Sequence, residues 1–145
     1  MNFATIGQNI VKLTIKYWDK FLITGMQYTI SLAALTVGVG AVIGALIALL
    51  RMSKIAPFRW IAAIYTEIIR GTPMVVQLLI TYYIILRSVD SKVLIAIIAF
   101  GLNSGAYQAE IIRAGITSID PGQMEAARAL GLGYWRAMLK IILPQ

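Results

Sequence analysis

An uncharged apolar run constrains this sequence more than any other feature. No Asp, Glu, Lys or Arg occurs from Phe21 to Leu50, a longer stretch than the roughly 20 helical residues that cross the hydrocarbon core of a bilayer. Hydrophobic residues make up 59% of the chain and charged residues 13%, against about a quarter charged in an ordinary soluble domain. The composition excludes a soluble fold and a disordered chain, and the run predicts a transmembrane helix long enough to tilt.

Two further apolar blocks follow the first, at Trp60–Leu86 and Val93–Ala109. The connections between the blocks are short, which favours antiparallel neighbours. We therefore predict an all-α, polytopic transmembrane bundle with three complete spans and the start of a fourth. The expected spans are residues 21–50, 60–86 and 93–112, with the fourth beginning at residue 141.

Glycine and proline mark two special places in these spans. Gly40 and Gly44 have the GxxxG spacing that allows close helix packing, although the ordinary glycine content of membrane helices explains them equally well. The triplet Gly71-Thr72-Pro73 interrupts the second span. We expect the helix to break there, because proline lacks the amide hydrogen and clashes with the preceding turn.

Residues 1–20 differ in character from the spans. Apolar residues recur there at three- and four-residue steps beside a stripe of lysines, which predicts an amphipathic helix in the lipid headgroup layer. A solvated flank is the alternative. The apolar residues are Phe3, Ile6, Ile10, Leu13 and Tyr17, and the lysines are Lys12, Lys16 and Lys20.

The residue types present exclude several kinds of chemistry. The chain has no Cys and no His, which rules out disulfides, Cys/His zinc sites and His-based catalytic relays. It has no G-x-x-x-x-G-K-[ST] loop, so it does not bind nucleotide in the P-loop manner. We expect neither an enzyme nor a cofactor or metal site, and no nucleic-acid binding, because the basic residues are scattered at span ends.

A helix with defined ends is predicted after the third span. Asp120 can cap its start, Pro121 suits the first helical position, and Gln123 completes a capping box. Gly131 fits the left-handed position just after a helix, and a second helix can begin at Tyr134 and run into the fourth span. A short helix with small side chains on its exposed face, between two spans, indicates a docking surface for another protein. The alternative is a segment that only turns the chain from one span to the next.

Part of this segment resembles a known transporter motif. The residues Glu125-Ala126-Ala127, Gly131, Ile141 and Leu143-Pro144 match every fixed position of the EAA motif, E-A-A-x3-G-x9-I-x-L-P, of permease subunits of bacterial ABC importers. Upstream, Glu67–Gln77 and Asn103–Glu110 resemble the polar amino acid permeases of the histidine/glutamine/arginine/opine branch. The resemblance covers residues 21–145.

This resemblance implies a permease subunit of an ATP-driven importer for polar amino acids in the bacterial cell membrane. Such a subunit pairs with a second permease subunit, receives its amino acid from an extracytoplasmic binding protein, and is driven by an ABC ATPase subunit. The coupling segment, residues 113–140, sits on the ATPase through Glu125, Ala126, Ala127 and Gly131. Family members continue through the rest of a fourth span and a fifth, so we expect this chain to be a fragment.

The resemblance places the N-terminus outside and the EAA segment in the cytoplasm. In that orientation seven basic residues face the cytoplasm and five face outward, which agrees narrowly with the positive-inside rule. Arg70 lies within the membrane. The cytoplasmic residues are Arg51, Lys54, Arg59, Arg113, Arg128, Arg136 and Lys140, and the outward residues are Lys12, Lys16, Lys20, Arg87 and Lys92.

Charged residues within the second span need partners. An unpaired charge at mid-bilayer costs about 2.5–3.5 kcal/mol on insertion scales. Glu67 and Arg70 are three residues apart on one helical face, so they can pair. These two residues are candidates for the substrate pathway, and an ion pair that only fixes helix register is the alternative.

Asn103, Tyr107 and Glu110 share one face of the third predicted helix. A zwitterionic amino acid needs acceptors for its ammonium group and donors for its carboxylate. Glu110 and Asn103 can supply the first, and Arg70, Asn103 or Gln77 the second. These residues are therefore further candidates for the pathway, with hydrogen bonding between helices as the alternative.

Two other functions fit part of the sequence. A carrier driven by an ion gradient would use Glu67 or Glu110 as its proton or sodium site. It would leave the segment from Asp120 to Gly133 unexplained. A membrane anchor or regulator that transports nothing would explain the spans and little else.

Overall fold

The computed structural model describes residues 3–145, and all regular elements in that range are helical. The all-α prediction is confirmed. Three short elements, η1 to η3, are π-helical turns. The elements are α1 (Phe3–Asp19), η1 (Lys20–Thr24), α2 (Gly25–Arg51), α3 (Ala56–Gly71), α4 (Met74–Ile80), η2 (Thr81–Ile85), α5 (Lys92–Thr117), α6 (Pro121–Ala129), α7 (Tyr134–Ala137) and η3 (Met138–Ile142).

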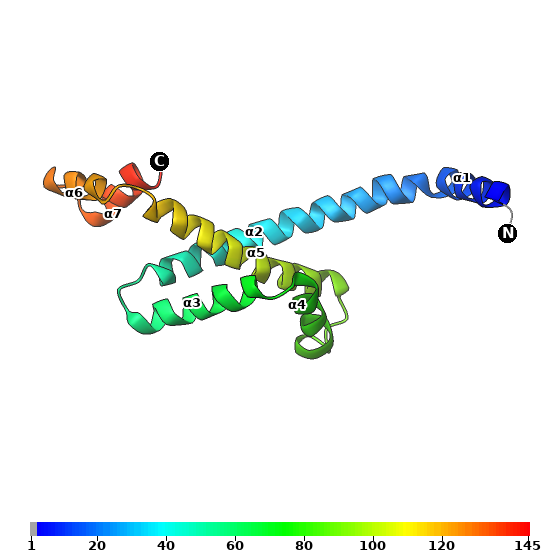
Figure 1. Cartoon of the computed structure of the whole chain (residues 1–145), viewed down its shortest axis with the longest axis horizontal. Coiled ribbons are helices and arrows are strands. Elements are labelled where there is room, and N and C mark those ends of the chain that lie inside the picture. Colours follow the sequence, from blue (N-terminus) through cyan, green and yellow to red (C-terminus); the bar gives the residue numbers. More distant parts are fainter. Residues whose placement is uncertain (1–2) are drawn as a thin grey trace.

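The N-terminal segment and the first span form one continuous helix, drawn from blue to cyan in Figure 1. The backbone at Asp19, Thr24 and Gly25 is right-handed helical, so the helix continues through η1 without a break. From Ile6 to Arg51 this helix has 46 residues, about 70 Å at 1.5 Å per residue. The N-terminal segment is helical from Phe3 to Asp19, whereas residues 1–2 lie outside the described residues. Its location in the headgroup layer stays a prediction.

Helices α2 and α5 cross in Figure 1 and pack against each other. Their approach is close because glycines of both helices lie at the contact. A Cβ on Gly44 would lie 3.1 Å from the backbone nitrogen of Ala109, and a Cβ on Gly101 would lie 2.8 Å from Val39. Gly40 and Gly44 are both buried, so close packing is the alternative, of the two left open by their spacing, that holds for them. Residue numbers rise in the same direction along the two contact faces, so α2 and α5 run parallel.

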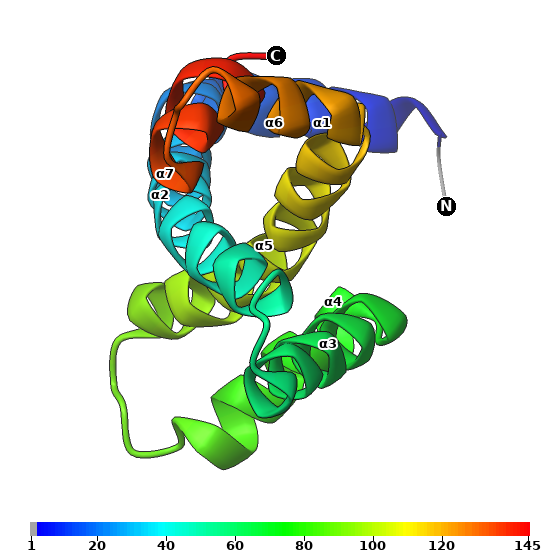
Figure 2. The same cartoon turned by 90° about the vertical axis from the view of Figure 1, so that its left-hand side faces the viewer.

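The second span is broken where the sequence predicted a break. Thr72 and Pro73 have extended backbone, and the axis turns by 108° between Ala56–Gly71 and Met74–Ile85. Two helices of the described chain are long and apolar enough to cross a membrane, and three spans result if this bent pair counts as one. Figure 2 shows α3 and α4 together on one side of the α2–α5 pair.

The parallel course of α2 and α5 determines which connections share an end of the bundle. The turn after Arg51 and the segment after Thr117 lie at one end, and the connection before Lys92 lies at the other (Figure 1). Helix α5 continues to Thr117, beyond the predicted end at residue 112. The loop and the EAA segment that were both expected in the cytoplasm are therefore on the same side of the bundle.

Candidate functional site

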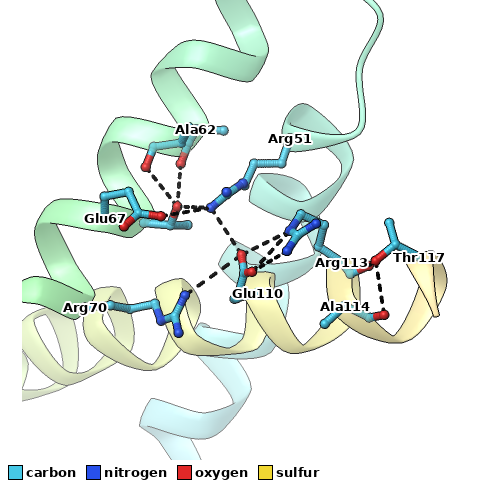
Figure 3. Close-up of polar contacts among 10 residues, drawn as sticks. Arg51, Ala62, Glu67, Arg70, Glu110, Arg113, Ala114 and Thr117 are labelled. Carbon is cyan, nitrogen blue, oxygen red and sulfur yellow. Dashed lines mark hydrogen bonds and ion pairs between the residues drawn. The ribbon is translucent and has the colours of Figure 1, made fainter.

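Glu110 of α5 is the centre of an ion-pair cluster that joins α2, α3 and α5 (Figure 3). Its Oε1 lies 2.5 Å from Nη2 of Arg113. Its Oε2 lies 3.1 Å from Nη1 of Arg51 and 3.9 Å from Nη1 of Arg70. The Glu110 side chain is 20% exposed, so most of its surface is covered by these partners and the helices that carry them. We call Glu67, Glu110, Arg51, Arg70 and Arg113 the Glu110 cluster.

Glu67 and Arg70 do not pair with each other among the described residues. Glu67 lies 3.9 Å from Arg51 and its side chain is 73% exposed, while Arg70 turns toward Glu110. Sequence spacing placed both on one face of α3, but it gave no information about charges that other helices bring to that face. The candidates are therefore linked through Arg51 and Glu110 instead of directly.

Arg51 is a member of this site that the sequence analysis assigned only to a cytoplasmic loop. Its side chain is 16% exposed, and its Nη1 donates a hydrogen bond to the hydroxyl of Thr66. Thr66 is fully buried and donates in turn to the carbonyls of Ala62 and Ala63. Its partner Glu110 lies far along the chain, so no local pattern could reveal the contact.

Gln77 and Asn103 connect the break in the second span to α5. The Gln77 side-chain nitrogen donates to the carbonyl of Ile69 at 2.6 Å and to that of Thr72 at 3.1 Å. It thereby satisfies carbonyls that lose their helical partners at the end of α3. Asn103 Nδ2 donates to Gln77 Oε1 at 3.1 Å, which is the interhelical hydrogen bond weighed as an alternative to substrate contact.

Tyr107 lies between Asn103 and Glu110 on α5. We call Gln77, Asn103, Tyr107, Arg70 and Glu110 the strip. The Arg70 guanidinium lies over its ring, 5.5 Å from the centroid, a distance typical of cation–π attraction. The predicted face of α5 thus meets α3 and α4 along its length: Asn103 contacts Gln77, Tyr107 contacts Arg70, and Glu110 contacts the arginines. The six substrate-pathway candidates thus form two contact groups on neighbouring parts of this face: Gln77 with Asn103, and Tyr107, Arg70 and Glu110 with Glu67 linked through Arg51.

The Glu110 cluster carries unbalanced charge. Its four ion pairs join three guanidinium groups to two carboxylates. Arg70 is the least engaged of the three, because its one carboxylate contact among the described residues is at 3.9 Å. An excess guanidinium is suited to a carboxylate ligand, since arginine can bind carboxylates in bidentate geometry.

The second candidate region is α6, the helix of the EAA segment, which begins as the sequence predicts. Asp120 is the N-cap residue, and its Oδ1 accepts a hydrogen bond from the Gly122 amide at 2.8 Å. Pro121 occupies the first helical position. The Gln123 amide bonds to the Asp120 backbone carbonyl, and no hydrogen bond of the Gln123 side chain is present among the described residues, so the N-cap forms as predicted whereas the predicted capping box does not.

The end of α6 explains why glycine occupies position 131. Gly131 has a φ of +83°, while its amide bonds to the Arg128 carbonyl and the Leu132 amide bonds to the Ala127 carbonyl. These two bonds define a Schellman motif, which requires left-handed backbone at this position. Within the described chain no atom lies within 4 Å of a Cβ added to Gly131. The requirement is therefore one of backbone conformation and not of space.

Helix α6 has one covered side and one open side. Ala127 is 2% exposed, and Met138 and Ile142 of η3, the element that α6 contacts, are also buried. Glu125 and Ala126 are exposed, and Leu130 is 84% exposed. Of the four expected coupling residues, Ala127 thus faces its own chain, whereas Glu125 and Ala126 are open to a partner.

Comparison with known proteins identifies relatives of this arrangement. The family model of the binding-protein-dependent transport system inner membrane component matches residues 40–145. The arginine transport system permease protein ArtQ of Bacillus subtilis (strain 168) is 41% identical over 128 residues, which cover 86% of this chain and 58% of ArtQ. The putative glutamine transport system permease protein GlnP of Rickettsia typhi is 46% identical over 143 residues, covering 94% of this chain and 65% of that protein.

The fold has a relative among solved structures as well. The crystal structure of an amino acid ABC transporter with histidines has a TM-score of 0.81 and 42% sequence identity to this chain. The match covers 92% of this chain and 63% of that one. The chain spans 58–65% of the length of these three proteins.

Proposed function

Because the chain belongs to the family of inner membrane components of binding-protein-dependent transport systems, we propose that it acts as a permease subunit of a bacterial ABC importer for polar amino acids. Transport would be driven by ATP hydrolysis in a separate ATPase subunit. The chain itself is a multi-pass membrane protein of a transporter family. The amino acid class follows from the names of its relatives, which include arginine, glutamine and cystine permeases.

The observation that carries the coupling part of this proposal is the open side of α6. A capped helix lies between α5 and α7, and its end is determined by the Schellman motif at Gly131. Exposed Glu125, Ala126 and Leu130 present a carboxylate, a small side chain and a large apolar side chain. Such a surface supports docking of another protein, because small residues let a partner backbone approach closely.

The strip from Gln77 to the Glu110 cluster supports the pathway part. The α-carboxylate of an amino acid would pair with Arg70, and its ammonium group would bind the side-chain carbonyl oxygen of Asn103 or the carboxylate of Glu110. Broken helices at membrane depth are tolerated where they line a cavity, and the break at Thr72 and Pro73 lies beside this strip. We therefore assign the strip to the substrate pathway.

The proposal extends to partners and orientation. An extracytoplasmic amino-acid-binding protein would deliver the substrate, and a second permease subunit, identical or related, would complete the pathway. The N-terminus would lie outside and α6 in the cytoplasm. The loop after Arg51 and α6 lie at the same end of the bundle, and both carry basic residues. Basic residues are enriched on the cytoplasmic side of membrane proteins, which supports this orientation.

A carrier driven by an ion gradient fits the cluster less well. Glu110 is already in contact with three guanidinium groups, which leaves little room for a sodium ion among them. Within the described residues no group of three or more acidic side chains could hold a metal ion. Such a carrier would also make no use of α6.

Cysteine cross-linking tests the proposed function, since the chain has no cysteine of its own. The full chain is co-expressed with an ABC ATPase subunit that carries single cysteines in its permease-facing groove. Ala126→Cys should cross-link to the ATPase, whereas Lys54→Cys, at the same end of the bundle but in another loop, should not. Labelling of the Ala126→Cys variant by an impermeant thiol reagent from outside the cell would contradict the proposal.

A further inference from the structure

The long N-terminal helix extends farther than a bilayer requires. From Ile6 to Arg51 it has 46 residues, or about 70 Å, whereas a bilayer with its headgroups is about 40–45 Å thick. Even at a tilt of about 40°, the upper limit for membrane helices, a straight helix of this length would span about 54 Å along the bilayer normal. Part of the helix therefore lies beyond the bilayer or changes direction at its surface.

The part in question is α1. The uncharged run from Phe21 to Leu50 is itself about 45 Å long as a helix, so it occupies the full thickness of the bilayer. Arg51 at the far end is held by Glu110 and Thr66, so the helix cannot shift inward. Figure 1 shows α1 at the end that is remote from α3 to α7, and all side chains of residues 8–16 are exposed.

Polar and apolar side chains of α1 are on separate sides of the helix. At about 100° per residue, every charged or amide side chain between Gln8 and Lys20 falls within a sector of about 120°, and every large apolar side chain falls outside it. Thr14, which lies among the apolar residues, donates its hydroxyl to the Ile10 carbonyl. The polar residues are Gln8, Asn9, Lys12, Lys16, Asp19 and Lys20, and the apolar residues are Ile10, Val11, Leu13, Ile15, Tyr17 and Trp18.

The lysines of the polar sector are free to bind an anionic partner. All four ion pairs among the described residues belong to the Glu110 cluster, so Lys12, Lys16 and Lys20 have no carboxylate partner there. Lys16 and Lys20 lie over the ring of Tyr17, with Nζ 5.3 and 5.8 Å from its centroid. With Asp19 as the one carboxylate, the sector carries net positive charge at the edge of an apolar surface, as in helices that lie on membranes.

The backbone has a place to bend between α1 and α2. In the π-helical turn Lys20–Thr24, the Gly25 amide bonds to the Lys20 carbonyl, five residues back instead of the four of an α-helix. Sharp bends in helices occur at such π-helical turns. The turn adjoins the start of the uncharged run at Phe21, so a bend there would lie at the bilayer surface.

We propose that α1 turns at η1 and binds the membrane surface at the end of the bundle opposite α6, through anionic phospholipids. Lys12, Lys16 and Lys20 would pair with lipid phosphates, and the apolar side would enter the boundary between headgroups and acyl chains. The straight and bent helices are two forms of one hinge, and the lipid surface selects the bent form. The proposed function determines only that this surface is the outer one.

Distances between spin labels measure the bend, because the chain has no cysteine of its own. The full chain with Asn9→Cys and Val37→Cys is labelled in nanodiscs of mixed phosphatidylcholine and phosphatidylglycerol. A straight helix separates these residues by about 42 Å, and a right-angle bend at Leu22 reduces the separation to about 30 Å. The control pair Met26→Cys and Val42→Cys, both within α2, should stay at about 24 Å. A separation of the first pair that stays at the straight-helix value overturns the inference.

Two neighbouring residues test which side of α1 meets the lipid. Ile10 lies on the apolar side and Asn9 on the polar side, at almost the same height along the helix. A spin label at Ile10→Cys should be the more accessible to oxygen, and a label at Asn9→Cys the more accessible to a water-soluble nickel chelate. Equal access of the chelate to both labels would place α1 in water and overturn the inference. Protection of the Ile10 label only after an amino-acid-binding protein is added would also overturn it, by assigning α1 to a protein partner.

Lysine variants test the charge of the lipid. The ratio of bent to straight helix should fall about fivefold for each of Lys12→Gln, Lys16→Gln and Lys20→Gln, the effect of one basic residue at an anionic membrane surface. Pure phosphatidylcholine should cause the same loss as the triple variant, whereas Lys54→Gln, at the other end of the bundle, should change nothing. An unchanged ratio in the triple variant, with helix content intact by circular dichroism, would overturn the assignment to anionic lipid. These measurements use no ATPase and no ATP, so a failed Ala126→Cys cross-link leaves them unaffected.

Discussion

Arg51, the last residue of α2, places its Nη1 3.1 Å from Oε2 of Glu110, two turns before the end of α5. The same guanidinium also donates to the buried hydroxyl of Thr66 on α3. One side chain thereby joins three helices that are distant in the sequence. Glycine contacts join α2 to α5, and Arg51 adds α3 to that pair.

Arg51→Ala should lower the free energy of unfolding by about 1.5–3 kcal/mol, the range for hydrogen bonds to charged groups. Glu110 would keep Arg113 at 2.5 Å, so its charge would not be left alone. Thermal unfolding of the full chain in detergent measures the change. Arg70→Ala, whose ion pair is at 3.9 Å, should have the smaller effect, and equal effects would contradict this account of the cluster.

Gly131→Ala should destabilise the end of α6 by about 1–2 kcal/mol, because left-handed backbone is costly for a residue with a Cβ. Gly133 is a matched control: its φ is −65°, and like Gly131 it has no described atom within 4 Å of an added Cβ. Gly133→Ala should therefore be neutral. Hydrogen exchange of the Leu132 amide, which closes the Schellman motif, should speed up in the Gly131 variant alone.

Gly44→Ala should weaken the packing of α2 on α5 by about 1–3 kcal/mol, the usual cost of overpacking. An added Cβ would lie 3.1 Å from the Gly105 carbonyl oxygen and the Ala109 amide nitrogen, and backbone atoms cannot rotate away. Gly38 lies on the same helix with no described atom within 4 Å, so Gly38→Ala serves as control. Similar thermal midpoints for the two variants would count against close packing at Gly44.

Asn103→Ala in a complete, reconstituted importer should reduce amino acid uptake by about tenfold, the effect of one lost hydrogen bond, while assembly stays intact. Gln77→Ala should also lower stability, because Gln77 satisfies the carbonyls at the end of α3. Ile111, which is 68% exposed, provides a control on another face of α5. Normal uptake by the Asn103 variant at normal expression would remove this residue from the pathway.

Local signals in the sequence predicted the elements that depend on local physics. Asp120 and Gly131 determine the ends of α6, and Pro73 determines the break in the second span. Each of these features needs only a few neighbouring residues. Gly40 and Gly44 were ambiguous, because their spacing suits both close packing and an ordinary membrane helix, and only the position of α5 decides between the two.

Contacts between helices were predicted less well. Asn103, Tyr107 and Glu110 do share one face of α5, and that face contacts Gln77 and Arg70 of the broken span, whereas Glu67 reaches it only through Arg51. Arg51 was missed, because its partners are on two other helices and a basic residue at a helix end is already favoured by the helix dipole. The burial of Ala127 was missed for a similar reason: the motif identifies the residue but not the element that covers it.

That burial has a mechanical consequence for α6. Ala127 faces its own chain where α6 contacts η3. A force applied to the exposed neighbour Ala126 would therefore be transmitted in two directions. One leads back through residues 118–120 into α5, and the other leads forward into Met138 and Ile142. A partner that pulls on this helix would therefore move α5, before it, and η3, after it, together.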